Sequence, residues 1–226
     1  MVIPDDIKLD EDEDVFDIVI RLEKSFAIKF EKDAFTDIKT FGDLCDVIES
    51  YIRYDSKEDC TRQQAFYKIR TAISNTQQID KKLITPDTRL VSLFPRHSRR
   101  RQVKLFQKQL GVNLKFLTYP GWLSLVLVGG LLASFIAFFF DWKIAVTGIA
   151  FFTIALNIAD KLGKDLAIET VKELTVKATT EHYIAMRSTK LTVNRNEILD
   201  IIKDCFINEL AINKEQLTRD AKFSWA

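Results

Sequence analysis

The stretch that decides the fold is PGWLSLVLVGGLLASFIAFFFDWKIAVTGIAFFTIALNIA, which runs from Pro120 to Ala159. An uncharged run of about 19 residues ends at Phe140 and has the length that a helix needs to cross the apolar core of a bilayer. A second run, of about 16 residues, follows a tight turn at Asp141-Trp142-Lys143, and the lysine at each of its ends can reach the membrane surface. We therefore expect a transmembrane helical hairpin over residues 120–160.

The alternative is a buried hairpin in the core of a soluble helical protein. A helix of a soluble protein keeps a polar stripe on the face that meets water. Between Trp122 and Phe140 the polar side chains are those of Ser124 and Ser134. This pattern favours the membrane over a soluble core.

Positive charges flank the hairpin on both sides, whereas the connecting turn has Lys143 alone. By the positive-inside rule, the flanks lie in the cytoplasm and the turn lies outside. We expect a two-pass protein of the bacterial inner membrane with both termini in the cytoplasm. The flanking charges are Arg96, Arg99, Arg100, Arg101, Lys104, Lys108 and Lys115 before the hairpin, and Lys161 and Lys164 after it.

Composition excludes several classes of function. The 226 residues have a formal net charge of +1, so we expect no nucleic-acid partner. The three cysteines, Cys45, Cys60 and Cys205, form no Cys-x-x-Cys pair, which is typical of a reducing compartment. His97 and His182 lack the spacing of metal ligands, and no Gly-rich phosphate loop occurs. The sequence thus nominates no catalytic residue, no metal site and no cofactor, and its acidic start resembles no cleavable signal peptide.

Apolar residues at helical spacing predict further helices on both sides of the hairpin. The acidic run Asp10 to Asp14 precedes the first one, where carboxylates stabilise the positive end of the helix dipole. A metal or partner site is the alternative for this run. Thr40 is expected to cap the second helix. The predicted core positions include Ile18, Leu22, Phe26, Phe41, Leu44, Ile48, Ile69, Ile73, Val103, Phe106, Ile198, Ile202 and Phe206.

The chain contains internal correspondences that predict two copies of one three-helix unit. Residues 66–90 match residues 199–223, residues 19–30 match residues 103–114, and residues 38–44 match residues 168–174. One copy contains the hairpin between its second and third helices, and the other is split across the termini. The predicted segments are 10–54 (helices II and III), 60–117 (helices I and II), 120–160 (the hairpin), 166–186 (helix III) and 194–226 (helix I of the split copy).

The split copy makes a structural prediction. The helix at 196–210 should pack on the helices at 15–26 and 41–52, either within one chain or between two protomers.

These motifs resemble those of the acyl carrier protein family. Helix I of that family ends in a segment similar to Ile84–Leu90 and Leu217–Phe223, helix II ends like Leu22–Ile28, and helix III opens like Ile38–Leu44 and Ile168–Leu174. The resemblance implies small helical bundles packed through Leu, Ile, Val and Phe. We therefore expect an all-α fold with two carrier-protein-like helical bundles, one of them split across the termini, and a two-helix transmembrane hairpin.

The sequence departs from this family at the position that matters for its chemistry. A working carrier attaches phosphopantetheine to the serine of an Asp-Ser-Leu motif at the start of helix II. Asp12 stands at about that position in the split copy, and a carboxylate cannot accept the group as a phosphodiester. In the other copy Ser98 stands there, within Arg96-His97-Ser98-Arg99-Arg100-Arg101, a basic context that reverses the acidic helix of the family. Ser98 is thus either a phosphopantetheine site or a helix N-cap.

The basic cluster of Arg96, Arg99, Arg100, Arg101, Lys104 and Lys108 precedes the hairpin by about 20 residues. It could attract anionic lipid head groups at about 1 kcal/mol per charge. It could also be a solvated helix face that only sets the topology, or pair with the acidic run of the other copy.

We expect a non-enzymatic scaffold that is anchored in the lipid bilayer and docks a protein partner at the cytoplasmic face. The spans carry no ionisable residue, which argues against a channel or transporter. The partner could be a second copy, bound through the carrier-like units or through the hairpin. Stripes of small residues let helices approach closely, so they should either hold the two helices of the hairpin together or mediate dimerisation: Gly129, Ala133 and Ala137 on the first helix, and Ala155 and Ala159 on the second. The alternatives are a membrane-tethered acyl carrier protein with phosphopantetheine on Ser98, and an enzyme of lipid metabolism.

Overall fold

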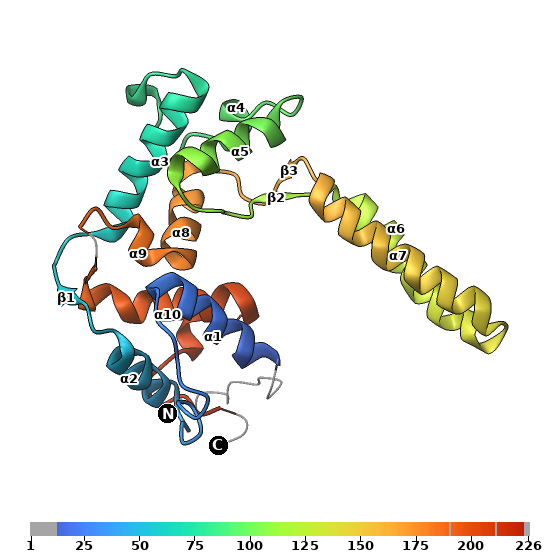
Figure 1. Cartoon of the computed structure of the whole chain (residues 1–226), viewed down its shortest axis with the longest axis horizontal. Coiled ribbons are helices and arrows are strands. Elements are labelled where there is room, and N and C mark those ends of the chain that lie inside the picture. The colour runs from blue at the N-terminus through green and yellow to red at the C-terminus, as the bar shows by residue number, and fades with distance from the viewer. Residues whose placement is uncertain (1–12, 190, 211, 224–226) are drawn as a thin grey trace. The chain divides into compact units, whose positions relative to one another are not determined.

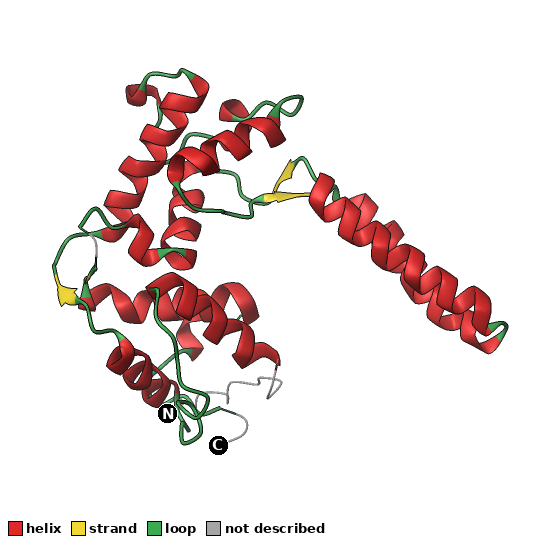
Figure 2. Cartoon of the chain, viewed as in Figure 1, coloured by secondary structure: helices red, strands yellow, loops and turns green. Residues whose placement is uncertain are grey.

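The computed structural model describes residues 13–189, 191–210 and 212–223. Most of them are helical, and the strands are pairs of two residues, which confirms the mainly helical class (Figure 1, Figure 2). The elements are α1 (Glu13–Phe26), α2 (Phe41–Tyr51), β1 (Asp55–Ser56), α3 (Thr61–Gln77), η1 (Lys81–Leu83), α4 (Leu90–Leu93), α5 (Arg99–Leu110), β2 (Leu117–Thr118), α6 (Gly121–Ile136), η2 (Ala137–Phe139), α7 (Trp142–Leu162), β3 (Asp165–Leu166), α8 (Val171–Glu181), α9 (Tyr183–Met186), β4 (Thr192–Val193), α10 (Arg195–Leu210) and η3 (Lys214–Gln216).

The chain divides into two compact units. Unit 1 comprises Met1–Ala72, Leu110–Leu114 and Leu174–Ala226, and unit 2 comprises Ile73–Gln109 and Lys115–Glu173. These limits differ from those of the predicted segments, because the first turns of α3 belong to unit 1 and the hairpin belongs to unit 2 with the chain on either side of it.

The core of unit 1 joins segments from the two ends of the chain. Helix α10 packs on α1 and α2, within a single chain, as the split copy predicts (Figure 1). Each helix contributes residues that recur at helical spacing, so that one apolar face of each is buried. The buried members include Ile18, Leu22, Phe26, Phe41, Leu44, Ile48, Ile198, Ile202 and Phe206.

Backbone hydrogen bonds hold the start of α2 to the end of the chain, at what we call the Thr40 junction (residues 39–43 with 219–223). Phe41 N donates to Ala221 O, Gly42 N donates to Arg219 O, and Phe223 N donates to Lys39 O. Thr40 and Asp43 also form the expected helix cap, in which each side chain accepts a hydrogen bond from the backbone N–H of the other residue.

The same pattern recurs in unit 2, at the Thr170 junction (residues 169–173 with 86–90). Val171 N donates to Thr88 O, Lys172 N to Pro86 O, and Leu90 N to Glu169 O. In the internal correspondence, each of these donors and acceptors is aligned with its counterpart at the Thr40 junction. For example, Val171 aligns with Phe41 and Thr88 aligns with Ala221. Glu173 takes the place of Asp43, since its carboxylate accepts from Glu169 N and its own N–H donates to Thr170.

Two further features recur at aligned positions. Ala27 and Gly111, each at the end of an aligned helix, adopt left-handed backbone with φ of 52° and 83°. The 3-10 helices η1 and η3 also occupy matching positions, after α3 and α10 respectively. The correspondence therefore extends to local backbone conformation.

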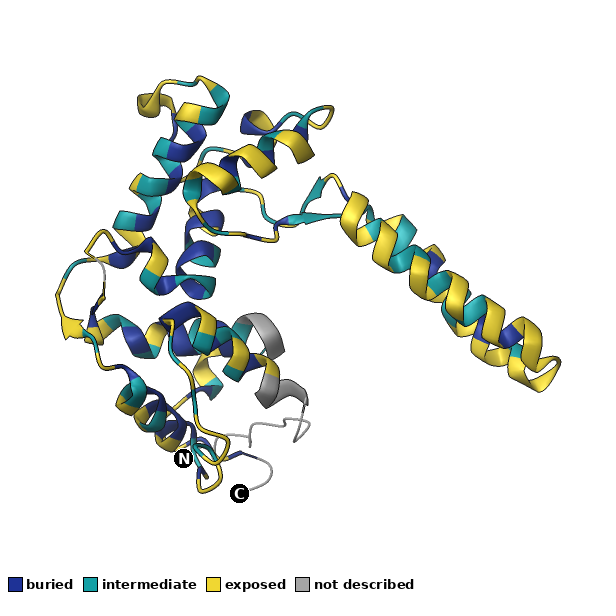
Figure 3. Ribbon diagram, in the orientation of Figure 1, coloured by how far each residue is buried: buried dark blue, intermediate teal, exposed yellow. Residues whose placement is uncertain are grey.

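The hairpin consists of α6, η2 and α7, which lie side by side (Figure 1). Gly121–Phe139 and Trp142–Leu162 are long and apolar enough to cross a membrane, with mean hydropathies of 2.3 and 1.6. Most of the large apolar side chains that the structure leaves exposed lie on these two segments (Figure 3). In water such a surface would be unfavourable at about 25 cal/mol per Å² of apolar area.

The contact between α6 and α7 uses small residues, but one position away from the expected stripe. A side chain at Gly130 would collide with the ring of Phe152, and one at Gly148 would collide with Ser134. Gly129, by contrast, faces open space. Of the two interpretations of the stripe containing Gly129, packing within the hairpin is wrong for Gly129, because the helix turns Gly130 and Ser134 toward α7. Its use in dimerisation stays a prediction.

A short neck closes the two ends of the hairpin. Strands β2 and β3 pair antiparallel, with Leu117 opposite Leu166 and Thr118 opposite Asp165. Gly163 follows α7, and a side chain there would collide with the backbone of Thr118. The neck therefore needs glycine for the close approach of its two backbones.

Candidate functional site

The base of the hairpin is where the basic cluster meets the apolar helices, and all of it lies in unit 2. Arg99 is 5% exposed, and its guanidinium donates to Phe94 O at 2.7 Å and to Lys164 O at 2.5 Å. Arg100 donates to Lys161 O at 2.7 Å. Both arginines thus bind carbonyl groups in and just after the last turn of α7, where a helix has unpaired acceptors and the negative end of its dipole.

The other cations of the cluster have different surroundings. Arg96 is ion-paired with Asp165 at 3.0 Å, and its side chain stays 67% exposed. Arg101, Lys104 and Lys108 are exposed on α5. The cluster therefore divides into two arginines that fasten the hairpin and four other cations. The sequence did not predict this division, because Arg96 and Arg101 are of the same residue type as Arg99 and Arg100.

Burial also changes the chemistry of Arg99. Desolvation lowers the pKa of its guanidinium, with the charge of Asp165 acting in the opposite direction. Since an arginine stays protonated over the physiological range, the group remains a cation at the end of α7.

Two hollows adjoin Arg96. One, of about 470 Å³, runs along the groove between α6 and α7 and is lined by Arg96, Tyr119, Pro120, Leu123, Leu127, Ala155, Ile158, Ala159, Leu162, Gly163 and Lys164. The second, of about 480 Å³, is lined by Arg89, Val91, Arg96, Arg99, Asp165, Leu166, Ile168 and Glu169. The first is almost entirely apolar apart from its two cations, whereas the second contains both acids and bases.

Ser98 directly precedes α5, the place of a helix N-cap, but its hydroxyl does not accept a hydrogen bond from the first turn of that helix. Its hydroxyl oxygen is buried and makes no hydrogen bond within the described part of the chain. A transferase would have to uncover this oxygen before attaching phosphopantetheine to it. Asp12, the corresponding position of the split copy, and residues 10–12 of the acidic run lie outside the described residues, so the pairing of that run with the basic cluster stays a prediction.

The described residues contain no group of three or more His, Cys, Asp or Glu that could hold a metal ion. Cys45 and Cys205 are buried and Cys60 is exposed, all three as free thiols. Burial raises the pKa of the Cys45 thiol to about 12, so this thiol is not a nucleophile at neutral pH. His97 is exposed, and His182 lies with its Nε2 3.1 Å from Asn113 O.

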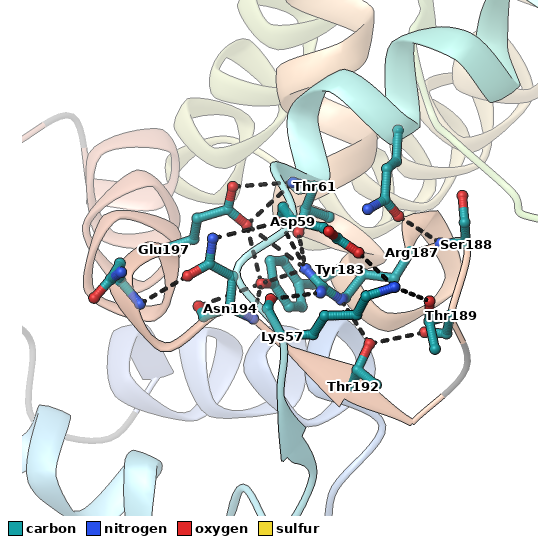
Figure 4. Close-up of polar contacts among 12 residues, drawn as sticks. Lys57, Asp59, Thr61, Tyr183, Arg187, Ser188, Thr189, Thr192, Asn194 and Glu197 are labelled. Atoms are coloured by element: carbon teal, nitrogen blue, oxygen red, sulfur yellow. Dashed lines mark hydrogen bonds and ion pairs between the residues drawn. The ribbon is translucent and has the colours of Figure 1, made fainter.

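Unit 1 contains a buried polar cluster around Arg187, which Figure 4 shows. The guanidinium donates from Nε to Thr192 Oγ1 at 3.1 Å, from Nη1 to Thr61 Oγ1 at 2.6 Å, and from Nη2 to Lys57 O at 2.9 Å. Its side chain is 1% exposed. These contacts join the start of α3 to the segment around β4, next to the parallel pairing of β1 with β4.

Tyr183 completes this cluster. Its hydroxyl donates to Glu197 at 3.0 Å and accepts from Asn194 N at 2.9 Å, and burial raises the pKa of the phenol. Arg187 and Tyr183 are thus fully covered and their polar atoms are engaged with protein groups. The hydrogen bonds of this cluster hold chain segments in place. A catalytic group must touch a substrate, and these two side chains are covered by protein.

The sequence reasoning missed this cluster, because Arg187 falls in a polar connection without periodicity. The one available signal was Tyr183 four residues before Arg187, a spacing that places two side chains on one helix face.

No protein-family model matches the chain. No curated protein and no solved structure shows significant similarity to it either.

Proposed function

We propose that this protein is a non-enzymatic scaffold, anchored by its hairpin in a membrane, that holds two carrier-protein-like helical units at the cytoplasmic face. The observation that carries the proposal is the hairpin itself. Its two apolar helices, each about 28–32 Å long by helix rise, match the thickness of a bilayer core. The positive charges of the flanks favour a cytoplasmic position for both ends of the hairpin.

The matched junctions support two related units. Three backbone hydrogen bonds of the Thr40 junction have counterparts, residue for residue, at the Thr170 junction. Chance similarity of apolar patterns would not produce the same donors and acceptors at aligned positions. The resemblance to carrier proteins is the most economical account of a repeated three-helix unit with these motifs.

The base of the hairpin favours a fixed scaffold over a working carrier. A carrier must swing its attached group between enzymes, whereas Arg99 and Arg100 fasten α5 to the end of α7. The hydroxyl of Ser98 is also covered. For these reasons we place the phosphopantetheine-bearing carrier second.

Native Cys60 permits a direct test of anchoring and topology, because it is exposed while Cys45 and Cys205 are buried. We expect a membrane-impermeant maleimide to label Cys60 only after cells are permeabilised. In a Cys60→Ser chain that also carries Asp141→Cys, we expect labelling of intact spheroplasts. Release of the protein by alkaline carbonate, or the opposite labelling pattern, would contradict the proposal. Intact mass of the natively expressed protein tests the alternative, because a phosphopantetheine adduct that Ser98→Ala removes would establish a carrier.

A further inference from the structure

We propose that the groove between α6 and α7 at the base of the hairpin binds one anionic glycerophospholipid. The inference rests on the proposed function in one respect, namely that the hairpin lies in a membrane. It goes beyond that function because it assigns a defined site to one lipid molecule, where a basic surface would attract many lipids diffusely.

The walls of the groove fit an acyl chain. Leu123 and Leu127 line one side of it on α6, and the opposite side comes from α7 through Ala155, Ile158 and Ala159. Along α7 the lining runs from Leu162 back to Ala155, about 11 Å of helix. The small side chains at positions 155 and 159 leave room beside the larger ones, and the hollow of about 470 Å³ has the size of a small-molecule site.

The mouth of the groove fits an anionic head group. Arg96 and Lys164 line it, next to Tyr119, whose ring suits the membrane interface. Asp165 lines the neighbouring hollow and pairs with Arg96, yet it leaves the Arg96 side chain 67% exposed. Arg100 adds a third cation at the same end of α7, since it donates to Lys161 O. Charge is therefore confined to one end of a groove that is otherwise apolar, which is the distribution of charge in an anionic lipid.

The position of the groove favours a lipid over a soluble anion. A free phosphate would use the cations but none of the apolar walls. In addition, the charged mouth lies at the end of the hairpin that the positive-inside rule assigns to the cytoplasmic leaflet, and anionic lipids are enriched there.

The test uses the full-length protein reconstituted in phosphatidylcholine vesicles that contain spin-labelled phosphatidylglycerol or, separately, spin-labelled phosphatidylcholine. We expect a saturable, motionally restricted component of one phosphatidylglycerol per chain, without an equal component from phosphatidylcholine. The variant Arg96→Gln/Lys164→Gln removes both charges, and it should weaken the binding of phosphatidylglycerol by roughly fivefold per charge. Ala155→Phe should abolish it by filling the groove.

Matched controls separate this site from general surface attraction. Lys104→Gln/Lys108→Gln removes the same charge from exposed positions of α5, and Ala133→Phe adds the same ring to an exposed position of α6; both should leave the component unchanged. Equal restriction of the two lipids, or an equal loss in the two charge variants, would overturn the site. Circular dichroism establishes that each variant is folded, and Ala159→Leu fills the same groove less severely if Ala155→Phe does not fold. A protein that fails to float with vesicles in high salt refutes the anchor, whereas one that floats without a selective component refutes the lipid site alone.

Discussion

Replacing Arg187 with Met removes a buried guanidinium that holds three chain segments together. Its hydrogen bonds to Lys57 O, Thr61 Oγ1 and Thr192 Oγ1 disappear, and buried acceptors are left without their charged donor. Breaking a buried charged network of this kind costs about 3–5 kcal/mol. For a chain of this length we expect the thermal midpoint in detergent, followed by circular dichroism, to fall by about 6–20 °C.

Arg62→Met is the matched control. Arg62 pairs with Asp204 at 2.6 Å, but its side chain is 46% exposed, so the loss of this pair should cost about 0–1 kcal/mol. Amide hydrogen exchange in the Arg187→Met protein should show lost protection at residues 57–61 and 192–197 in particular. A midpoint for Arg187→Met no lower than that for Arg62→Met would refute the reasoning, because the network would then contribute nothing beyond a surface pair.

Three further predictions concern single positions. Gly42→Ala places a Cβ 2.7 Å from Arg219 O at the Thr40 junction. It should destabilise the chain by about 1–3 kcal/mol in the same thermal assay. A stability equal to that of the wild type would contradict this prediction. Gly163→Ala should open the neck, because the new side chain collides with the backbone of Thr118. The amide of Ala167, which donates to Phe116 O, should then exchange its hydrogen faster. Unchanged exchange would show that the neck tolerates a side chain. His182 has a pKa that burial lowers, with the hydrogen bond to Asn113 opposing, so the unfolded chain takes up its proton first as the pH falls below about 6.5. Stability should therefore decrease from pH 7 toward pH 5, and His182→Gln should flatten this dependence; an equal slope in the variant would assign it to other groups.

The hairpin and the helical class were predictable because uncharged runs and helical periodicity are local signals. The helix cap at Thr40 was predictable for the same reason. The neck was not, since β2 and β3 have two residues each and no strand pattern fits within so few positions. The sequence also could not tell which arginine of the basic cluster is buried, because one of the two carbonyl partners of Arg99 belongs to Lys164, 65 residues away in the chain.

The small-residue stripe shows a further limit. Gly129 and Gly130 are adjacent in the sequence, and a spacing rule serves either of them equally well. The side chains of α7 decide between them, because the ring of Phe152 requires the space at Gly130.

The core of unit 1 constrains the order in which the protein can form during its synthesis. Helices α1 and α2 emerge from the ribosome before α10 and the segment that reaches Phe223, which complete their core. At ordinary translation rates the residues from 52 to 223 take roughly 9–34 s to produce. The hairpin emerges within that interval, so the apolar faces of α1 and α2 stay uncovered until the hairpin and α10 have both been synthesised. Protection of these faces in the nascent chain is therefore a requirement that the order of the elements imposes.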